Sequence, residues 1–275
     1  MVATHERNYK KPIKWFALPQ LFRYERQQKG RLREHFQFNA DLIGETDPAA
    51  DAELIALLID TLRSFGLTEQ DFVIRLSSRN AWQEFYRGST RAPRVESGAL
   101  PDSSASEYEF FQIIDKLERT PPEESQKKLA ALGFALDDVN AFINSGKPTA
   151  ELASIIANLA ARGLREFVKV DYKVIRGLAY YTGVVFEAFD AKGEFRAIAG
   201  GGRYDNLVKL ISGGKVNLPR SASAWAMSSC WNCSKRVACC QNSIRTWTFL
   251  FDRGRNPPRT VAQTHPGFAR CRIRR

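Results

Sequence analysis

Strand-like and helix-like patterns occupy separate blocks of the first 219 residues. Residues 14–25 are rich in apolar and aromatic side chains, and residues 34–44 alternate between apolar and polar positions, as β-strands do. Residues 107–163 instead carry a helical pattern broken by prolines and glycines. Strand patterns return at 167–174 and 184–189. This order predicts an α+β fold with an antiparallel sheet, flanking helices and a helical insertion, rather than repeated βαβ units.

Residues 46–66 carry the signals of a complete helix. Thr46-Asp47-Pro48 offers a capping side chain and a proline in the first turn, and Gly66 ends a run of leucines and isoleucines at helical spacing. Shorter elements complete the prediction: strands at 71–79 and 195–198, an exposed loop at 89–106, and a final helix at 203–211 that follows glycines with free N–H groups at 200–202.

The composition changes abruptly at residue 220. The last 56 residues hold all five cysteines and eleven basic residues against one acid, a net charge of +10, whereas residues 1–219 hold thirty basic and twenty-nine acidic residues. The whole-chain charge of +11 therefore does not indicate a polyanion-binding surface on the main body. Without a bilayer-spanning apolar run or a signal peptide, a cytoplasmic location with no membrane contact is expected.

Three clusters of polar and small residues are candidates for chemistry. The first surrounds the loop between the two initial strand regions, the second is RGLAYYTG at 176–183, and the third is GGGRYD at 200–205. Arginine binds phosphate in a bidentate manner, and glycine lets a backbone approach a ligand. For each cluster alone, a solvated charged face, core tyrosines or an ordinary turn is the alternative. The first cluster comprises Arg23, Glu25, Arg26, Arg31, Arg33, Gln37 and Asp41.

Taken together and in this order, the three clusters resemble one known family. FRYERQQKGRLREHFQFNADLIG (22–44) resembles the second signature motif of histidyl-tRNA synthetases, which are class II aminoacyl-tRNA synthetases. RGLAYYTGVVFEAF (176–189) and AIAGGGRYDNLV (197–208) resemble the two histidine-specific motifs of that family. The resemblance covers residues 11–219 and implies a class II catalytic core.

The resemblance implies an ATP-binding role for the arginines. Arg23 would clamp the α-phosphate, with Glu25 near the adenine and Arg31 near the outer phosphates. Arg176 would lie by the α-phosphate and the histidine carboxylate as the family's electrophilic arginine. Mg²⁺ would accompany ATP, and no separate protein metal site is expected, because the chain has only three histidines and no P-loop.

The resemblance implies a histidine pocket from the remaining motif positions. Gln37 and Asp41 would contact substrate histidine, Asp41 standing where the family usually has Glu. Tyr180 and Tyr181 would line the imidazole pocket. Gly200, Gly201 and Gly202 would form its floor. Histidine would be activated with ATP and transferred to the 3′ end of histidine tRNA.

Two departures from the family pattern lower the expected activity. Ala179 stands where the family motif usually carries Asp. The chain also begins almost at the second motif, so we expect the first class II motif and the interface of the family homodimer to be missing, with a truncated and impaired copy as the result.

The tail from residue 220 has two interpretations. Cys230, Cys233, Cys239 and Cys240 could bind a metal beside an arginine-rich RNA-binding arm, but the adjacent second pair is poor zinc spacing. The alternative is a shifted reading frame. Reading suitable codons for 220–240 from the third base gives LGFGMGDVVLLELLKARGLL, a glycine-rich strand and helix expected of the family's third motif. Trp225-Ala226 forces a Gly and Trp231-Asn232 forces a Glu in that frame, whatever the codons.

The preferred interpretation is a histidine–tRNA ligase core with a tail that has no evolved fold. The expected domains are residues 1–88 and 164–219 as the catalytic core, 89–163 as loop and helical insertion, and 220–275 as an out-of-frame or disordered tail. One alternative is the non-catalytic, histidine-sensing regulatory subunit of ATP phosphoribosyltransferase, which has no need to hold ATP phosphates. A basic RNA-binding protein is the other.

Overall fold

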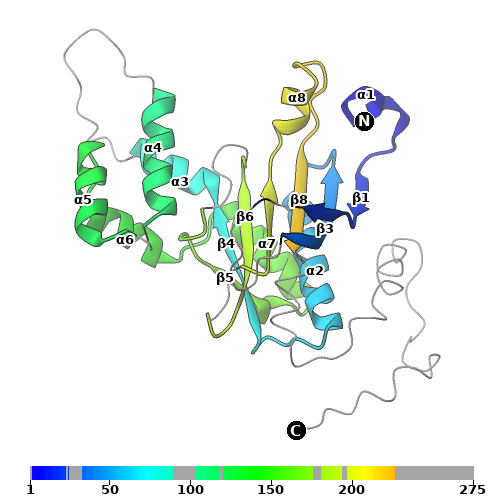
Figure 1. Cartoon of the computed structure of the whole chain (residues 1–275), viewed down its shortest axis with the longest axis horizontal. Helices are drawn as coiled ribbons and strands as arrows, with labels where there is room; N and C mark the ends of the chain where they lie inside the picture. The colour runs from blue at the N-terminus through cyan, green and yellow to red at the C-terminus, as the bar shows by residue number, and fades with distance from the viewer. Residues whose placement is uncertain are drawn as a thin grey trace.

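A mostly antiparallel eight-stranded sheet forms the centre of the molecule (Figure 1). The computed structural model describes residues 2–22, 24, 33–88, 103–117, 120–175, 181–193 and 197–226. The strands run in the order β1-β3-β8-β7-β6-β4-β5, with β2 paired to β3, and β4 and β5 are parallel. Their bounds are β1 Ile13–Ala17, β2 Gln20–Phe22, β3 Glu34–Ile43, β4 Phe72–Ser78, β5 Val168–Val170, β6 Val184–Asp190, β7 Ala199–Arg203 and β8 Arg220–Ala226.

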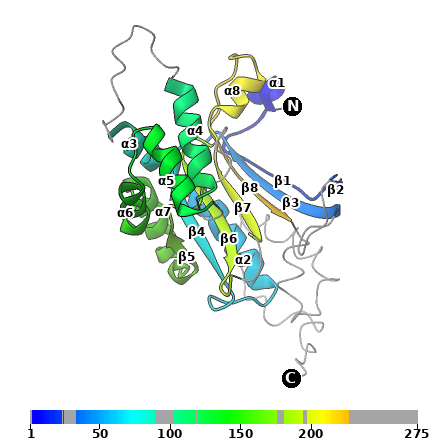
Figure 2. The ribbon, with the colours of Figure 1, turned by 60° about the vertical axis from the view of Figure 1, so that its left-hand side comes forward.

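Helices cover one face of this sheet and form a lobe beside it, which confirms the predicted α+β class. Figures 1 and 2 both show α3 to α6 gathered at the β4 side, away from β1 to β3. The bounds are α1 Val2–His5, α2 Pro48–Ser64, α3 Arg79–Gly88, α4 Ser103–Asp115, α5 Pro122–Ala131, α6 Leu136–Ser145, α7 Ala150–Ala161 and α8 Leu207–Ile211, with 3₁₀ turns η1 Glu6–Asn8 and η2 Arg165–Phe167.

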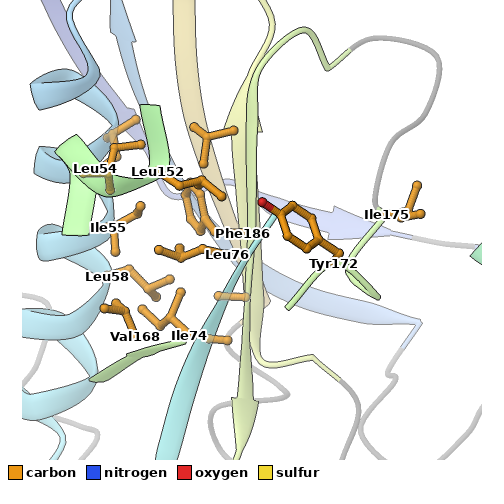
Figure 3. Close-up of a cluster of buried hydrophobic side chains, with 14 of the residues drawn as sticks. Leu54, Ile55, Leu58, Ile74, Leu76, Leu152, Val168, Tyr172, Ile175 and Phe186 are labelled. Carbon is orange, nitrogen blue, oxygen red and sulfur yellow. The ribbon is translucent and has the colours of Figure 1, made fainter. Parts of the chain in front are cut away.

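Helix α2 supplies the main apolar contact with the sheet. Asp47 caps it by accepting a hydrogen bond from the N–H of Ala49 at 2.8 Å, and Pro48 lies in its first turn, as predicted. Figure 3 shows the α2 side chains pointing toward the sheet, with α7 contributing from beside them. Because α7 packs on α2, the last helix of the predicted insertion shares the core of the sheet. The cluster includes Leu54, Ile55, Leu58, Ile74, Leu76, Leu152, Val168 and Phe186.

The lobe of α3 to α6 is held by a cluster of packed aromatic rings. Trp82 packs against Phe142 with ring centroids 4.7 Å apart, and Phe110 packs against Phe134 at 4.5 Å. The Trp82 indole N–H donates to the carbonyl of Tyr172 at 3.1 Å, which fastens the lobe to the segment after β5. No element was expected at 80–88, although Trp82 and its neighbours at helical spacing already carried the signal of α3.

Two predicted strands differ in extent from the observed ones. The region 14–25 forms β1 and β2 rather than one strand, and 167–174 contributes only the three residues of β5. The expectation that Gly200–Gly202 leave free N–H groups was wrong, because these glycines lie inside β7, and α8 starts later than the expected helix at 203. The described β7 pairs with β6 and β8 on either side, so its backbone groups belong to the ladders. Neighbouring strands thus override the low strand propensity of glycine.

The fold continues past Pro219, where the predicted tail begins. Residues 220–226 form β8, which lies between β3 and β7 and pairs antiparallel with both. The expected tail without a fold therefore does not begin at residue 220, because residues 220–226 belong to the sheet. Strand pairing uses backbone N–H and C=O groups, so a segment can complete a sheet without the side chains of the expected motif. Residues 227–275, including the cysteines, lie outside the described residues.

We predict that a chain ending at Ala226 keeps the sheet and that a chain ending at Pro219 loses it. Removing β8 leaves β3 and β7 with unpaired edges in the middle of the sheet. Urea unfolding followed by circular dichroism measures the outcome, with the full chain as reference. Cooperative, full-length-like unfolding of the chain ending at Pro219 would contradict the central position of β8.

Candidate functional site

The open face of the sheet, opposite α2, carries the polar residues of β3. Phe38 and Ala40 point into the core with at most 1% of their surface exposed. Since strand residues alternate between faces, Gln37, Asn39 and Asp41 lie on the other face, where each is partly exposed. The predicted alternation is confirmed for residues 37–42, whereas Phe36 is half exposed and His35 is buried, and it places two predicted histidine-binding residues on one surface.

The middle of this open face is occupied by small residues. Across the strands, Asn39 is in register with Ala224, Ala224 with Gly200, and Gly200 with Glu187. With strands about 4.8 Å apart, Asn39 and Glu187 stand roughly 14 Å from one another. The two positions between them are an alanine and a glycine in the sequence. We call these two positions, Ala224 and Gly200, the floor of the open face.

Gly202 has no room for a side chain. A Cβ atom there would lie 2.7 Å from the carbonyl oxygen of Val184 and 2.8 Å from Cδ1 of Tyr181. The ring of Tyr181 thus closes over the β7 backbone beside the floor. The glycine at this position is required by packing in a strand rather than by a turn.

Two tyrosines and a carboxylate form one corner of the open face. The hydroxyl of Tyr204 donates to Oδ1 of Asp41 at 3.3 Å, and the rings of Tyr204 and Tyr181 meet edge to face with centroids 5.9 Å apart. Both tyrosines are 9% exposed. Further along β3, the Gln37 side-chain amide donates to Oδ1 of Asn39 at 2.7 Å. The corner presents a carboxylate whose orientation is fixed by a phenol.

The structure brings some of the predicted site residues together. Asp41, Tyr181 and Gly202 meet at the corner, Gly200 lies on the floor, and Gln37 shares the same face. Gly201 has the opposite strand parity and faces the core side. The remaining predicted site residues lie outside the described residues: Arg23, Glu25, Arg31, Arg176 and Tyr180.

The sequence placed Arg203 and Tyr204 in the third candidate cluster, directly after the glycines, but gave neither residue a role. Arg203 is 5% exposed, and its Nε and Nη2 donate to Oδ2 of Asp51 at 3.0 and 2.7 Å. Nη1 donates to the carbonyl of Glu45 at 3.0 Å and to Asp205 at 3.4 Å, and Nη2 also reaches the carbonyl of Asp47 at 3.3 Å. A signal was available, because Asp51 shares the apolar stripe of α2 with Leu54, Ile55 and Leu58, where a carboxylate needs a buried partner.

Glu151, on the first turn of α7, adds a further carboxylate beside this ion pair. Its carboxyl pKa is raised above the ordinary value, first by burial and then by the nearby Asp51 carboxylate, while Arg203 opposes the rise. Oε1 of Glu151 lies 3.2 Å from the position that a Cβ on Gly183 would take. Glu151 therefore holds its proton more tightly in the folded chain than in the unfolded one.

The described ranges show no metal cluster and no membrane helix. Within them, no group of three or more His, Cys, Asp or Glu side chains is arranged to hold a metal ion. No helix in the described part of the chain combines the length and apolarity that crossing a membrane demands. What the corner can do chemically is accept an N–H group on the Asp41 carboxylate beside aromatic rings.

Comparison with known protein sequences gives matches over most of the chain. A family model described as Histidyl-tRNA synthetase matches residues 1–222. A histidine–tRNA ligase of Opitutus terrae is 46% identical over 227 residues, which cover 78% of this chain and 51% of that protein. A chloroplastic/mitochondrial histidine–tRNA ligase of Arabidopsis thaliana is 37% identical over 218 residues, which cover 74% and 43%. The chain thus spans about half the length of the curated relatives it matches.

Solved structures share the fold. A histidyl-tRNA synthetase from Nostoc sp. PCC 7120 superposes with a TM-score of 0.67 at 20% identity, covering 84% of this chain and 56% of that one. A protein titled ATP phosphoribosyltransferase regulatory subunit/histidyl-tRNA synthetase from Bacillus halodurans C gives 0.65 at 19% identity, covering 85% and 61%. At these identities the likeness establishes the architecture and does not separate the two activities in the titles.

We predict that Gly202→Ala destabilises the fold by about 1–3 kcal/mol, because overpacking forces Tyr181 or the Val184 backbone to move. Gly88→Ala is the matched control, since a Cβ there meets nothing within 4 Å. Urea unfolding of both variants measures the difference. Equal stability of the two variants would show that the Tyr181 contact does not constrain position 202.

We predict that the stability of the Glu151→Gln variant increases relative to that of the wild type as pH rises. A carboxyl whose folded pKa is raised contributes stability at pH below its ordinary pKa and loses it as pH rises through the folded pKa. Urea unfolding between pH 4 and 8 checks the trend. Glu124→Gln is the control, because Lys128 lowers the pKa of that exposed carboxyl and no such gain is expected. A stability difference between Glu151→Gln and the wild type that stays constant with pH would refute this account.

Proposed function

The chain belongs to the histidyl-tRNA synthetase family, and from this premise we propose that it activates histidine with ATP and serves the transfer of histidine to tRNA. The family predicted from the three motifs is thereby confirmed, while the activity of the chain is our proposal. The observation that carries it is the corner formed by Asp41, Tyr204 and Tyr181 beside a floor of small residues.

The corner suits the imidazole of histidine. The Asp41 carboxylate accepts a hydrogen bond from an imidazole N–H, and the hydrogen bond donated by the Tyr204 hydroxyl holds the carboxylate in place. Tyr181 contributes an aromatic edge, and its ring takes the space that a side chain at Gly202 would fill. Gln37 lies on the same face for a second polar contact. Tyr180 is proposed to belong to the same pocket.

The ATP end of the reaction is assigned to residues outside the described ranges. We propose that Arg23 and Arg31 bind the phosphates, that Glu25 lies near the adenine, and that Arg176 stabilises the charge on the α-phosphate. An oxygen of the histidine carboxylate attacks the α-phosphorus, the bond to the β-phosphate oxygen breaks, and pyrophosphate leaves. A ribose hydroxyl at the tRNA 3′ end then attacks the acyl carbon of the histidyl-adenylate, and AMP leaves.

Mg²⁺ is proposed to enter with ATP. This ion keeps several waters, takes substrate phosphates as ligands and requires only one or two protein carboxylates. Glu187 has a register position on the open face, so one oxygen ligand of the right type is present there. The ion would neutralise phosphate charge while the arginines orient the phosphates.

Several broader expectations remain proposals on the same premise. They are histidine tRNA as partner, the family homodimer, a cytoplasmic location where translation consumes the product, and a frame change near residue 220. The last is supported by the family match, which ends at residue 222. ATP binding separates this proposal from the histidine-sensing regulatory subunit, because a sensor has no need to hold ATP phosphates.

We predict that Asp41→Asn weakens histidine binding at least tenfold and leaves ATP binding within twofold. The amide offers one accepting oxygen in place of two and brings a donor toward the imidazole N–H. Isothermal titration of the full chain with histidine, and separately with ATP, measures both constants. Asp41→Glu is the control that keeps the carboxylate and should retain measurable binding. Wild-type affinity in the Asn variant would overturn the assignment of this corner to histidine.

A further inference from the structure

Arg203 is tied to both ends of the Tyr204–Asp41 hydrogen bond. We propose that Arg203 is a positioning residue that sets the place of the Asp41 carboxylate, and so determines histidine affinity without touching the substrate. The inference rests on the proposed function, because it takes Asp41 to be the residue that recognises histidine. It concerns a side chain that lies on the far side of the β7 end from the corner.

The first end of the hydrogen bond is fixed through the backbone of Arg203. This residue ends β7, and Tyr204 follows it directly. The Arg203 carbonyl accepts the N–H of Thr182 at 2.7 Å, and the Thr182 hydroxyl accepts the N–H of Asp205 at 3.0 Å. Tyr204 is therefore bracketed by two hydrogen bonds to a single residue. Movement of the Arg203 guanidinium would pull on the backbone that directs the Tyr204 ring.

The second end is fixed through the turn that follows β3. Asp41 lies near the end of this strand, and the chain then turns through Glu45 and Asp47 into α2. Arg203 donates to the carbonyls of Glu45 and Asp47 at 3.0 and 3.3 Å. The same guanidinium bonds Asp51 in the first turn of α2. The strand that carries Asp41 and the helix after it thus share one anchor.

The chemistry of arginine explains why one side chain can do this. A guanidinium has five N–H donors in a rigid plane, and the described bonds of Arg203 number five: two to Asp51, two to backbone carbonyls and one to Asp205. Lysine has three donors on one atom and cannot reach the same set. A buried ion pair adds little net stability relative to an apolar pair, so its geometric precision is the property that such a site uses.

The test is a double-variant cycle on histidine binding. Arg203→Lys, Tyr204→Phe and the double variant are titrated with histidine and with ATP as full-length proteins. We expect Tyr204→Phe to weaken histidine binding roughly fivefold, which is the net effect of one hydrogen bond, and Arg203→Lys by a similar or larger factor. The double variant should bind histidine no more weakly than the single variant with the lower histidine affinity, because both changes act through one contact. ATP affinity should stay within twofold throughout.

The matched control for the hydroxyl deletion is Tyr172→Phe. Tyr172 is 1% exposed, and its hydroxyl donates to the carbonyl of Lys147 at 2.7 Å at the lobe junction. This variant should lose stability and keep its histidine affinity. If Arg203→Lys does not fold, Tyr204→Phe decides alone: weakened histidine binding supports the inference, and unchanged binding overturns it.

The possible outcomes separate the inference from the proposed function. Three outcomes would overturn the role of Arg203. The losses of histidine affinity in the two single variants could multiply in the double variant, or the variants could lose as much affinity for ATP as for histidine. The third outcome is an unchanged histidine affinity in Arg203→Lys. Failure of the wild-type chain to bind histidine overturns the proposed function, and with it the premise of the inference. If the wild-type chain and the variants all bind histidine with the same affinity, the inference is overturned and the proposed function stands.

Discussion

The buried ion pair between Arg203 and Asp51 is the contact on which the arrangement of the sheet and its first long helix depends. A charge with 6% side-chain exposure is tolerated only when its partners are complete, and here a carboxylate and two backbone carbonyls lie at the same place. Because those partners come from α2 and from the turn before it, the end of β7 has one position relative to both. The corner formed by Asp41, Tyr204 and Tyr181 is therefore held in one position as well.

The site depends on the positions at which the sheet tolerates small side chains. Most strands must bring apolar side chains to α2, and the core face of β3 does so with Phe38, Ala40 and Leu42. On the other face, Gly200 and Gly202 give up side-chain packing, which lowers strand propensity, and the sheet retains the strand through its two neighbours. At Gly202 the missing side chain makes room for the ring of Tyr181, which packs on the β7 backbone.

The parts of this fold that depend on local spacing could be predicted from the sequence. The cap and stripe of α2 and the alternation of β3 are local, and they correctly placed Gln37 and Asp41 on one face. The contact between Tyr204 and Asp41 joins residues 163 positions apart, and no local pattern contains it. The glycines of β7 misled the prediction for the same reason, since their strand exists through β6 and β8. Family resemblance supplied what spacing could not, namely the family to which the chain belongs.

The position of β8 has a consequence for the order in which the protein acquires structure during synthesis. It is the last described strand to leave the ribosome, yet it lies between β3 and β7. Until it emerges, the β1–β3 ribbon and the β7–β6–β4 sheet have no strand to join them, and each half exposes an open edge that can pair with other chains. The contacts that unite the halves span most of the chain, which makes their formation slow. Nascent chains of this topology therefore depend on protection of those edges until residue 226 has been translated.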